Sequence, residues 1–156
     1  MHIRRYKPGE EKRLWEIFFN TIHKINVRDY NQDQLLAWAP PDLDNEIWKN
    51  KIESINPYVA VSDECIVGYA DLQENGLIDH FFCDHRWQRK GVGSLLMREI
   101  QGEAIKKGIR SLSSEVSITA KPFYASHGFV VTKNQILEIR GMRLINYRME
   151  KPLTSG

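Results

Sequence analysis

The sequence predicts a single domain of mixed α/β class, with a central, mostly antiparallel mixed sheet flanked by helices. Runs with strand-like and helix-like hydrophobic periods follow one another along the chain, with helices before, within and after a series of strands. The length of 156 residues corresponds to about one domain and is sufficient for a substantial core. A helical segment separates two of the later strands, which predicts one parallel pair joined by a right-handed crossover.

The first half of the chain is predicted to contain one edge strand and three helices. The first helix follows a Pro-Gly pair, has acids in its first turn and carries a long apolar stripe at helical spacing. Consecutive prolines stop the second helix. The expected elements are a strand over 2–6, a helix beginning at 8–11, a loop over 26–30, and helices over 32–38 and 42–53.

The second half alternates strands with two helices. Three β-rich runs joined by short polar turns predict a meander, and glycine ends the long helix that follows. The expected elements are strands over 58–61, 66–70 and 77–83, a helix over 94–108, a strand over 109–118, a short helix over 119–127, and last strands over 129–132, 135–139 and 142–149.

Composition and charge exclude several classes of protein. Hydrophobic residues make up 42% of the chain and charged residues 27%, as in ordinary globular proteins. A net charge of +2 gives no electrostatic argument for nucleic acid binding. No apolar run approaches the roughly 18 residues of a membrane helix, and the N-terminus has no apolar signal segment. We therefore expect a cytoplasmic protein without nucleic acid or membrane partners.

The cysteines and histidines give no disulfide or metal pattern. Cys65 and Cys83 lie in apolar, strand-like runs and are predicted to be reduced core residues. The five histidines are scattered without the spacing of zinc ligands, so we expect no metal. Because no Gly/Ser/Pro-rich linker divides the chain, we expect one domain over residues 1–151 and a tail over 152–156.

The stretch from Leu77 to Gly108 contains the strongest functional signal. In this stretch a predicted strand is connected to a predicted helix by the segment Gln88-Arg89-Lys90-Gly91-Val92-Gly93-Ser94. Two glycines one residue apart let backbone amides turn toward a ligand, and the start of the helix adds unpaired amides and partial positive charge. The pattern predicts an anion site, most simply for phosphate or pyrophosphate. A tight strand–helix turn without a ligand is the alternative.

The spacing of these glycines excludes two familiar phosphate-binding motifs. There is no P-loop, and leucine at position 96 removes the third glycine of the dinucleotide fingerprint. The hexapeptide from Gln88 to Gly93 instead resembles motif A of the GNAT superfamily of N-acetyltransferases, [QR]-x-x-G-x-[GA]. The segment Ala120–Phe129 resembles the A-x-x-[FL]-Y-x-x-x-G-F signature of the same superfamily. The order of elements is similar to the GNAT acyl-CoA N-acyltransferase fold over nearly the full chain, and a YafP-like bacterial branch is one candidate.

The resemblance implies acetyl-coenzyme A as the donor co-substrate. Backbone amides of residues 90–94 would hold its pyrophosphate, and the edge of the strand ending at Cys83 would pair with its pantetheine arm. A backbone amide there would also polarise the thioester carbonyl. His85 stands where many relatives carry proline, and Ser117 where many carry asparagine. The implied cofactor-binding residues are Phe82, Cys83, His85, Gln88, Arg89, Lys90, Gly91, Val92, Gly93, Ser94 and Ser117.

Acetyl transfer to an amine needs an acid for the leaving thiolate and a base for the amine. The resemblance places Tyr124 as the acid. Asp79 and His80 interrupt an otherwise apolar strand and are the candidates for the base. Because neighbours on a strand face opposite ways, only one of them should face the cleft. Glu74 and Glu115 are lesser candidates.

The acceptor is the least determined part of the prediction. In the superfamily it meets the loop between the first two helices, here residues 26–38, and the strand opposite the cofactor, here parts of residues 69–71. Asp29, Tyr30 and Trp38 would form a partly aromatic, acidic pocket for a cationic amine, and surface or packing roles for them are the alternative. The main hypothesis is an N-acetyltransferase acting on a small amine or a protein amino group. The alternatives are a non-catalytic module that senses acyl-coenzyme A and a plain nucleotide- or phosphate-binding domain. A homodimer is compatible with the sequence.

Overall fold

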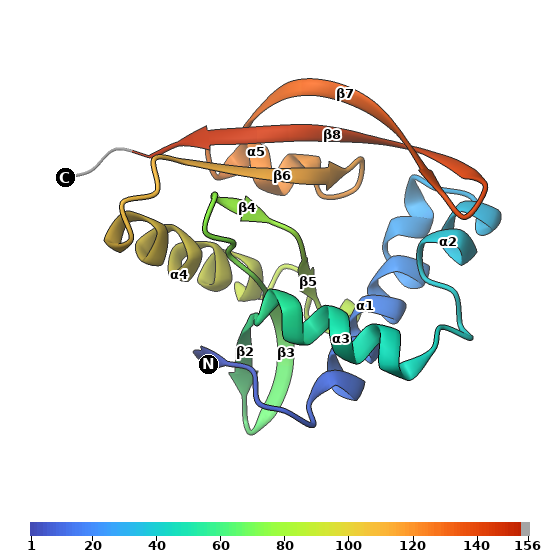
Figure 1. The fold of residues 1–156 in the computed structure, drawn as a ribbon, viewed down its shortest axis with the longest axis horizontal. Coiled ribbons are helices and arrows are strands. Elements are labelled where there is room, and N and C mark those ends of the chain that lie inside the picture. Colours follow the sequence, from blue (N-terminus) through green and yellow to red (C-terminus); the bar gives the residue numbers. More distant parts are fainter. Residues whose placement is uncertain (154–156) are drawn as a thin grey trace.

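The computed structural model describes residues 1–153, whose strands form two four-stranded sheets (Figure 1). The strands are β1 (His2–Arg5), β2 (Tyr58–Ser62), β3 (Cys65–Ala70), β4 (Leu77–Ile78), β5 (Phe81–Cys83), β6 (Ser111–Ser117), β7 (Val130–Ile139) and β8 (Met142–Pro152). The first sheet has the order β1-β2-β3-β5 and is antiparallel. The second has the order β4-β6-β8-β7, and its β4–β6 pair is parallel, which confirms the predicted crossover.

Five α-helices and two short 3₁₀ turns connect the strands. They are α1 (Glu11–Lys24), η1 (Asn26–Arg28), α2 (Gln32–Trp38), α3 (Asn45–Ile55), η2 (His85–Trp87), α4 (Val92–Lys106) and α5 (Lys121–Ser126). Local capping explains two of the starts. The side chain of Asn31 accepts from the amide of Gln34 at the start of α2, and Asp44 accepts from the amide of Glu46 at the start of α3.

Helices cover both faces of the first sheet because β2 and β3 are apolar on both sides. On β2, Tyr58 and Ala60 belong to the core formed with α4, whereas Val59 and Val61 belong to the core formed with α1, α2 and α3. This strict alternation is the period-2 pattern of a strand buried on both faces. The result is a mixed α/β fold, as the sequence predicts.

The predicted strand 77–83 is wrong as a single strand. Its first part is β4, which joins the second sheet, and its last part is β5, which joins the first. Asp79 and His80 lie at the break. The chain changes sheets there because the carboxylate of Asp71, rather than a neighbouring strand, takes both backbone amides.

The C-terminal hairpin is longer than predicted. The two expected strands at 129–132 and 135–139 form one strand, β7, with a register shift between Val131 and Lys133. β8 continues to Pro152, so the predicted tail begins later, and residues 154–156 lie outside the described part of the chain. In Figure 1 this hairpin arches over the molecule from α5 to α2.

Candidate active site

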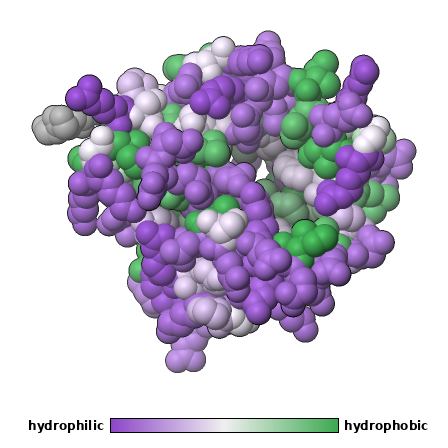
Figure 2. Space-filling model, in the orientation of Figure 1, coloured by the Kyte–Doolittle hydropathy of each residue, from purple (hydrophilic) through white to green (hydrophobic). Residues whose placement is uncertain are grey.

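A cavity of about 970 Å³ lies where the two sheets diverge. Its walls come from the end of α1, from η1 and the end of α2, from the β4–β5 break, from the start of α4, from β6 and α5, and from the β7–β8 hairpin. Figure 2 shows the surface hollowed between the hairpin above and α3 below, with apolar atoms inside the hollow. Most of the residues that the sequence singles out meet in this cavity.

One end of the cavity is formed by the N-terminus of α4. Gly91 caps the helix with a φ of 85°, and no side chain bonds to the first turn. Among the described residues, the amides of residues 92–94 have no hydrogen-bond partner. A Cβ at Gly91 would meet nothing within 4 Å, whereas a Cβ at Gly93 would lie 2.9 Å from Cε1 of Phe123. The geometry is that of an anion site on a helix start.

The predicted cofactor-binding residues divide into those that face the cavity and those that do not. Three of them do not line the cavity. The side chain of Val92, the first residue of α4, is buried in the core, and Nζ of Lys90 lies 5.3 Å from the centre of the Trp87 ring. His85 lies toward α1, with its Nε2 3.5 Å from Nζ of Lys24. Burial and the nearby Lys24 lower the pKa of His85. The residues that line the cavity are Phe82, Cys83, Gln88, Arg89, Gly91, Gly93, Ser94 and Ser117.

β5 is the edge strand of the first sheet and borders the cavity. The amide of Asp71 donates to the carbonyl oxygen of His80, and the amide of Asp84 donates to that of Val67. Because antiparallel bonds alternate along a strand, the amides between these two positions that face away from β3 are those of residues 81 and 83. The carbonyl oxygen of Cys83 accepts from Oγ1 of Thr21 at 2.7 Å and from Nε2 of Gln88 at 3.0 Å. Donors thus remain on this edge for an extended ligand.

Tyr124 is buried on α5 and is one of the residues that line the cavity. It lies 3.2 Å from Oγ of Ser114, which itself donates to the carbonyl oxygen of Ile78 at 2.8 Å. Since the single hydroxyl hydrogen of Ser114 goes to Ile78, Tyr124 is the donor in its bond to Ser114. Burial raises the pKa of Tyr124, so the hydroxyl keeps its proton at neutral pH.

His80 lies in a box of aromatic rings that opens on the cavity. It stacks on Phe18 with 5.4 Å between ring centroids, and Trp48 and Phe82 complete the box. Its Nδ1 lies 3.0 Å from the hydroxyl of Tyr69. Burial lowers the pKa of His80 to about 4, with Asp79 opposing the shift, so the ring is neutral at pH 7.

Asp79 also lines the cavity, contrary to the expectation that only one of the two neighbours would face it. The alternation rule fails because the strand is broken at these residues. The carboxylate of Asp79 is 2.5 Å from Nζ of Lys51 on α3, and both side chains are about one-third exposed or more, at 35% and 41%. The structure therefore brings both candidate bases to one place and gives Asp79 a cationic partner.

Asp71 has a role in the site that the sequence analysis did not assign to it. It is fully buried, and its Oδ1 accepts from the amides of Asp79 and His80 at 2.8 and 2.7 Å, while Oδ2 accepts from Nε2 of Gln73. Burial raises its pKa to about 6, although these hydrogen bonds oppose the shift. A lone acid directly after an apolar strand was the available signal. Ser114 was also missed, and its only signal was a serine inside a buried strand.

The predicted acceptor residues are only partly in the cavity. Tyr30 and Trp38 line it and pack edge-on with 5.5 Å between ring centroids. The Tyr30 hydroxyl donates to the carbonyl oxygen of Ile145 and accepts from the amide of Ile118, which fixes the ring. Asp29 lies outside the lining, and its carboxylate accepts from Oγ1 of Thr119 at 2.8 Å.

Three further expectations concern cysteine, metals and membranes. Cys65 is exposed, so its assignment to the core is wrong, whereas Cys83 is half-buried and burial raises its pKa to about 12. Within residues 1–153, no group of three or more His, Cys, Asp or Glu side chains is placed to hold a metal ion. Over the same residues, the helices are too short or too polar to cross a bilayer.

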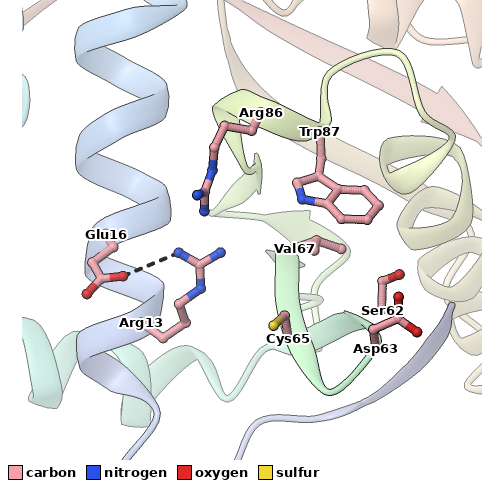
Figure 3. A pocket seen from close by; sticks show the side chains of 8 residues that line it. All are labelled: Arg13, Glu16, Ser62, Asp63, Cys65, Val67, Arg86 and Trp87. Atoms are coloured by element: carbon pink, nitrogen blue, oxygen red, sulfur yellow. Dashed lines mark hydrogen bonds and ion pairs between the residues drawn. The ribbon is translucent and has the colours of Figure 1, made fainter.

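A second, smaller cavity of about 410 Å³ lies on the other side of η2 (Figure 3). Arg13 donates to the carboxylate of Asp84 at 2.6 Å, and Arg86 bonds the same group at 3.1 Å. Burial opposes ionisation of Asp84, but the hydrogen bonds from Arg86 and Arg13 outweigh it and hold its pKa below the usual range. The arginines of this cavity thus serve to fix the turn before α4, and Trp87 lines both cavities.

Comparison with known proteins identifies the family. A family model described as an acetyltransferase (GNAT) domain matches residues 26–151. The uncharacterized N-acetyltransferase YafP of Escherichia coli K12 is 33% identical over 149 residues, which cover 96% of this chain and 94% of that protein. A GCN5-related N-acetyltransferase from Rhodopseudomonas palustris superposes with a TM-score of 0.93 at 26% identity, over 97% of this chain and 95% of the other.

A more distant structure shows the same fold with a ligand. The PaiA N-acetyltransferase of Thermoplasma acidophilum, solved in complex with coenzyme A, has a TM-score of 0.75 at 18% identity, over 97% of this chain and 98% of the other. The family model, the YafP relative and the fold agree with the two motifs around Gly91 and Tyr124. The chain therefore belongs to the GNAT family of acetyl-coenzyme A-dependent N-acetyltransferases.

Proposed function

We propose that this chain transfers the acetyl group of acetyl-coenzyme A to a primary amine, on a small molecule or a protein, by direct attack of the amine. Acetyl-coenzyme A supplies an acyl group activated as a thioester. The observation that carries the proposal is the position of the Tyr124 hydroxyl, in one cavity with the unpaired amides at the start of α4.

The residues present fit this donor. Amides of residues 92–94, together with Arg89, would bind the pyrophosphate, because a helix start favours negative charge. Gly93 packs so closely on Phe123 that a side chain there would have to displace the ring. The free edge of β5 would bind the pantetheine arm as an added strand, with Phe82, Cys83 and Gln88 beside it. A backbone amide of that edge would polarise the thioester carbonyl. His85, Lys90, Val92, Ser94 and Ser117 complete the proposed set.

Tyr124 is the proposed acid. Its hydroxyl is protonated at neutral pH and already donates, so a small rotation from Ser114 would direct the proton toward the departing sulfur. Ser114, which also lines the cavity, holds the hydroxyl in place when no ligand is bound. This arrangement favours a catalytic role over a tyrosine that is merely packed in the core.

His80 and Asp79 are the proposed bases, and both stay in consideration. A neutral imidazole can accept a proton at Nε2 when Nδ1 donates to the Tyr69 hydroxyl. Asp79 is a stronger hydrogen-bond acceptor, but Lys51 already occupies its carboxylate. The exposure of the Lys51–Asp79 pair also lets a water molecule connect Asp79 to the amine. We favour His80 in the tautomer that has its hydrogen on Nδ1, because Nε2 then has a free lone pair.

The acceptor would enter from the α2 end of the cavity. Tyr30 and Trp38 offer an aromatic wall there, and Asp29 would act by holding Thr119 on the rim. A second candidate function, a sensing module that binds acyl-coenzyme A without turnover, uses the same donor site. It has no need for a buried, protonated tyrosine in the cavity lining, so the placement of Tyr124 favours the enzyme.

A homodimer is part of the proposal. β7 is an edge strand, and the directly opposed pair Ile136 and Ile145 on the hairpin exposes 69% and 50% of its surface. Exposed apolar side chains beside an open strand edge are typical of an interface. Light scattering after gel filtration would measure the mass, and a monomer at tens of micromolar would contradict this point.

The experiment that tests the proposed function measures release of free thiol from acetyl-coenzyme A with a broad set of amines. Calorimetry with acetyl-coenzyme A, run beside it, separates binding from turnover. Binding with amine-dependent thiol release supports the enzyme. Binding with no release for any amine supports the sensing module, and absence of binding would contradict both.

A further inference from the structure

The end of the cavity away from α4 carries two arginines whose charge no carboxylate offsets. Arg28, on η1, lines the cavity, and within residues 1–153 its guanidinium makes no hydrogen bond or ion pair. Arg140, in the β7–β8 turn, lines it too and donates from Nη1 to the carbonyl oxygen of Ala37 at 2.7 Å, a neutral partner. That bond joins the hairpin turn to the end of α2, and the two lie together in Figure 1.

The other charged side chains around this end already have partners. Lys51 and Asp79 neutralise each other at 2.5 Å. Glu115 pairs with Arg148 at 3.7 Å and accepts a hydrogen bond from a neighbouring glutamine. Asp29, next to Arg28 in the sequence, lies outside the cavity lining, and no ion pair joins the two. The net local charge is therefore positive, the opposite of the acidic pocket that the sequence suggested.

Polar and apolar groups beside the arginines add to the description of the ligand. Asn146 is buried on β8, and its Oδ1 accepts from Gln135, which leaves its amide nitrogen as a donor without a partner among the described residues. Ile25, Trp38 and Leu137 form apolar wall at the same end. The site thus offers several donors for an anion next to a surface for a hydrocarbon or aromatic body.

We infer that the acceptor is a small amine that also carries a carboxylate, held by Arg28 and Arg140, with an apolar body between the two groups. The inference rests on the proposed function and names its substrate class. Guanidinium groups match a carboxylate through paired, charge-assisted hydrogen bonds. A purely cationic acceptor would meet like charge at this end, so the pocket selects against a lysine side chain.

The first test compares acceptors that differ only in the anion. Each set contains a carboxylate, its amide and its decarboxylated analogue. The first set is L-phenylalanine, L-phenylalaninamide and 2-phenylethylamine. The second and third sets are built in the same way from leucine and from 4-aminobenzoate. The amides keep the shape of the amino acids, and because the amine pKa is lower in the amide than in the amino acid, rates are compared per unprotonated amine. We expect kcat/KM for at least one carboxylate to exceed that of its amide by about tenfold or more.

The second test uses variants. In Arg28→Gln and Arg140→Gln, the preferred carboxylate should lose about tenfold in kcat/KM, mainly through KM, while its amide changes less than twofold. Arg143→Gln on the same hairpin, outside the cavity lining, is the matched control and should leave both values unchanged. Equal rates for carboxylate and amide across all sets, or equal effects of the variants on both, would overturn the inference.

A third measurement separates this inference from the proposed function. Binding of N-acetyl-L-phenylalanine and of its amide to the coenzyme A complex, followed by calorimetry, reports on the pocket without turnover. Tighter binding of the carboxylate that is lost in Arg28→Gln supports the inference even if no amine releases thiol. Turnover that is confined to amines without an anion leaves the proposed function intact and refutes the inference.

Discussion

Asp71 and His80 are joined twice: Oδ1 of Asp71 accepts from the amide of His80 at 2.7 Å, and the amide of Asp71 donates to the carbonyl oxygen of His80 at 3.1 Å. The same Oδ1 accepts from the amide of Asp79 at 2.8 Å. These bonds keep β5 on the first sheet while β4 leaves for the second. The buried carboxylate therefore holds open the gap between the sheets, in which the cavity lies.

Replacing Asp71 separates charge from geometry. In Asp71→Ala the two amides lose their partner, and we expect a loss of about 2–4 kcal/mol in the free energy of unfolding and a large fall in kcat. Asp71→Asn keeps a carbonyl oxygen that can accept from both amides, and its amide nitrogen can donate to the side-chain oxygen of Gln73 after that side chain flips. We therefore expect Asp71→Asn to retain most of the native stability and most of the native kcat. Urea unfolding and steady-state kinetics measure the two quantities. Equal damage by Asn and Ala would show that the charge, rather than the geometry, is required.

The pH dependence of stability should reveal two buried groups with opposite signs. Burial lowers the pKa of His80 to about 4, so between pH 6.5 and 4 the unfolded state binds more protons and stability falls as the pH falls. Burial raises the pKa of Asp71 to about 6, so between pH 6 and 4 the folded state binds more protons and stability rises as the pH falls. The two contributions offset each other in the native chain.

Single variants should expose each contribution. In Asp71→Asn the free energy of unfolding should fall toward pH 4 by up to about 1.4 kcal/mol per pH unit, because only His80 remains. In His80→Asn it should rise over the same interval. Urea titrations at half-unit steps of pH measure these slopes relative to the native chain. Identical slopes in both variants would mean that neither group is buried as described.

The fold could be predicted from the sequence because local patterns of apolar residues, glycines and prolines indicate most of its strands and helices. The β-rich apolar runs within residues 58–70 and the glycines before α4 predict elements that the structure contains. The break of the strand at Asp79 could not be predicted from the sequence. The residue that causes it, Asp71, is eight positions away, and its sequence context is that of an acidic residue in an ordinary turn. Likewise, Arg140 reaches Ala37 across more than a hundred residues, so the charge of the acceptor end depends on tertiary contacts alone.

The general base can be assigned from pH–rate profiles. We expect His80→Asn to lower kcat by about a hundredfold or more and to remove the acidic limb of kcat/KM. Asp79→Asn should have a smaller effect, because Lys51 already occupies the carboxylate. Lys51→Met is a further comparison: it frees the carboxylate of Asp79, and it should also raise the pKa of His80, because the charge of Lys51 helps to lower that pKa. A loss in Asp79→Asn larger than in His80→Asn would make Asp79 the base.

Tyr124→Phe should reduce kcat by about two orders of magnitude and leave the affinity for acetyl-coenzyme A nearly unchanged. The reason is that the hydroxyl is the proposed proton donor, whereas the ring alone provides the packing. The lost bond to Ser114 should cost only about 1 kcal/mol in stability. Tyr147→Phe, which removes a hydroxyl outside the cavity lining, is the matched control. If Tyr124→Phe turns over like the native chain, the tyrosine is structural and another group protonates the sulfur.

Two glycines of α4 give a matched pair for the donor site. A Cβ at Gly93 would lie 2.9 Å from Cε1 and 3.0 Å from Cζ of Phe123, so Gly93→Ala must displace that ring beside the proposed pyrophosphate site. A Cβ at Gly102 meets nothing within 4 Å, so Gly102→Ala should stabilise the helix by up to about 1 kcal/mol. Calorimetry should therefore show acetyl-coenzyme A binding about tenfold weaker in Gly93→Ala and unchanged in Gly102→Ala. Unchanged binding in Gly93→Ala would mean that the pyrophosphate does not bind at the start of α4, because a methyl group at residue 93 leaves no room for its close approach.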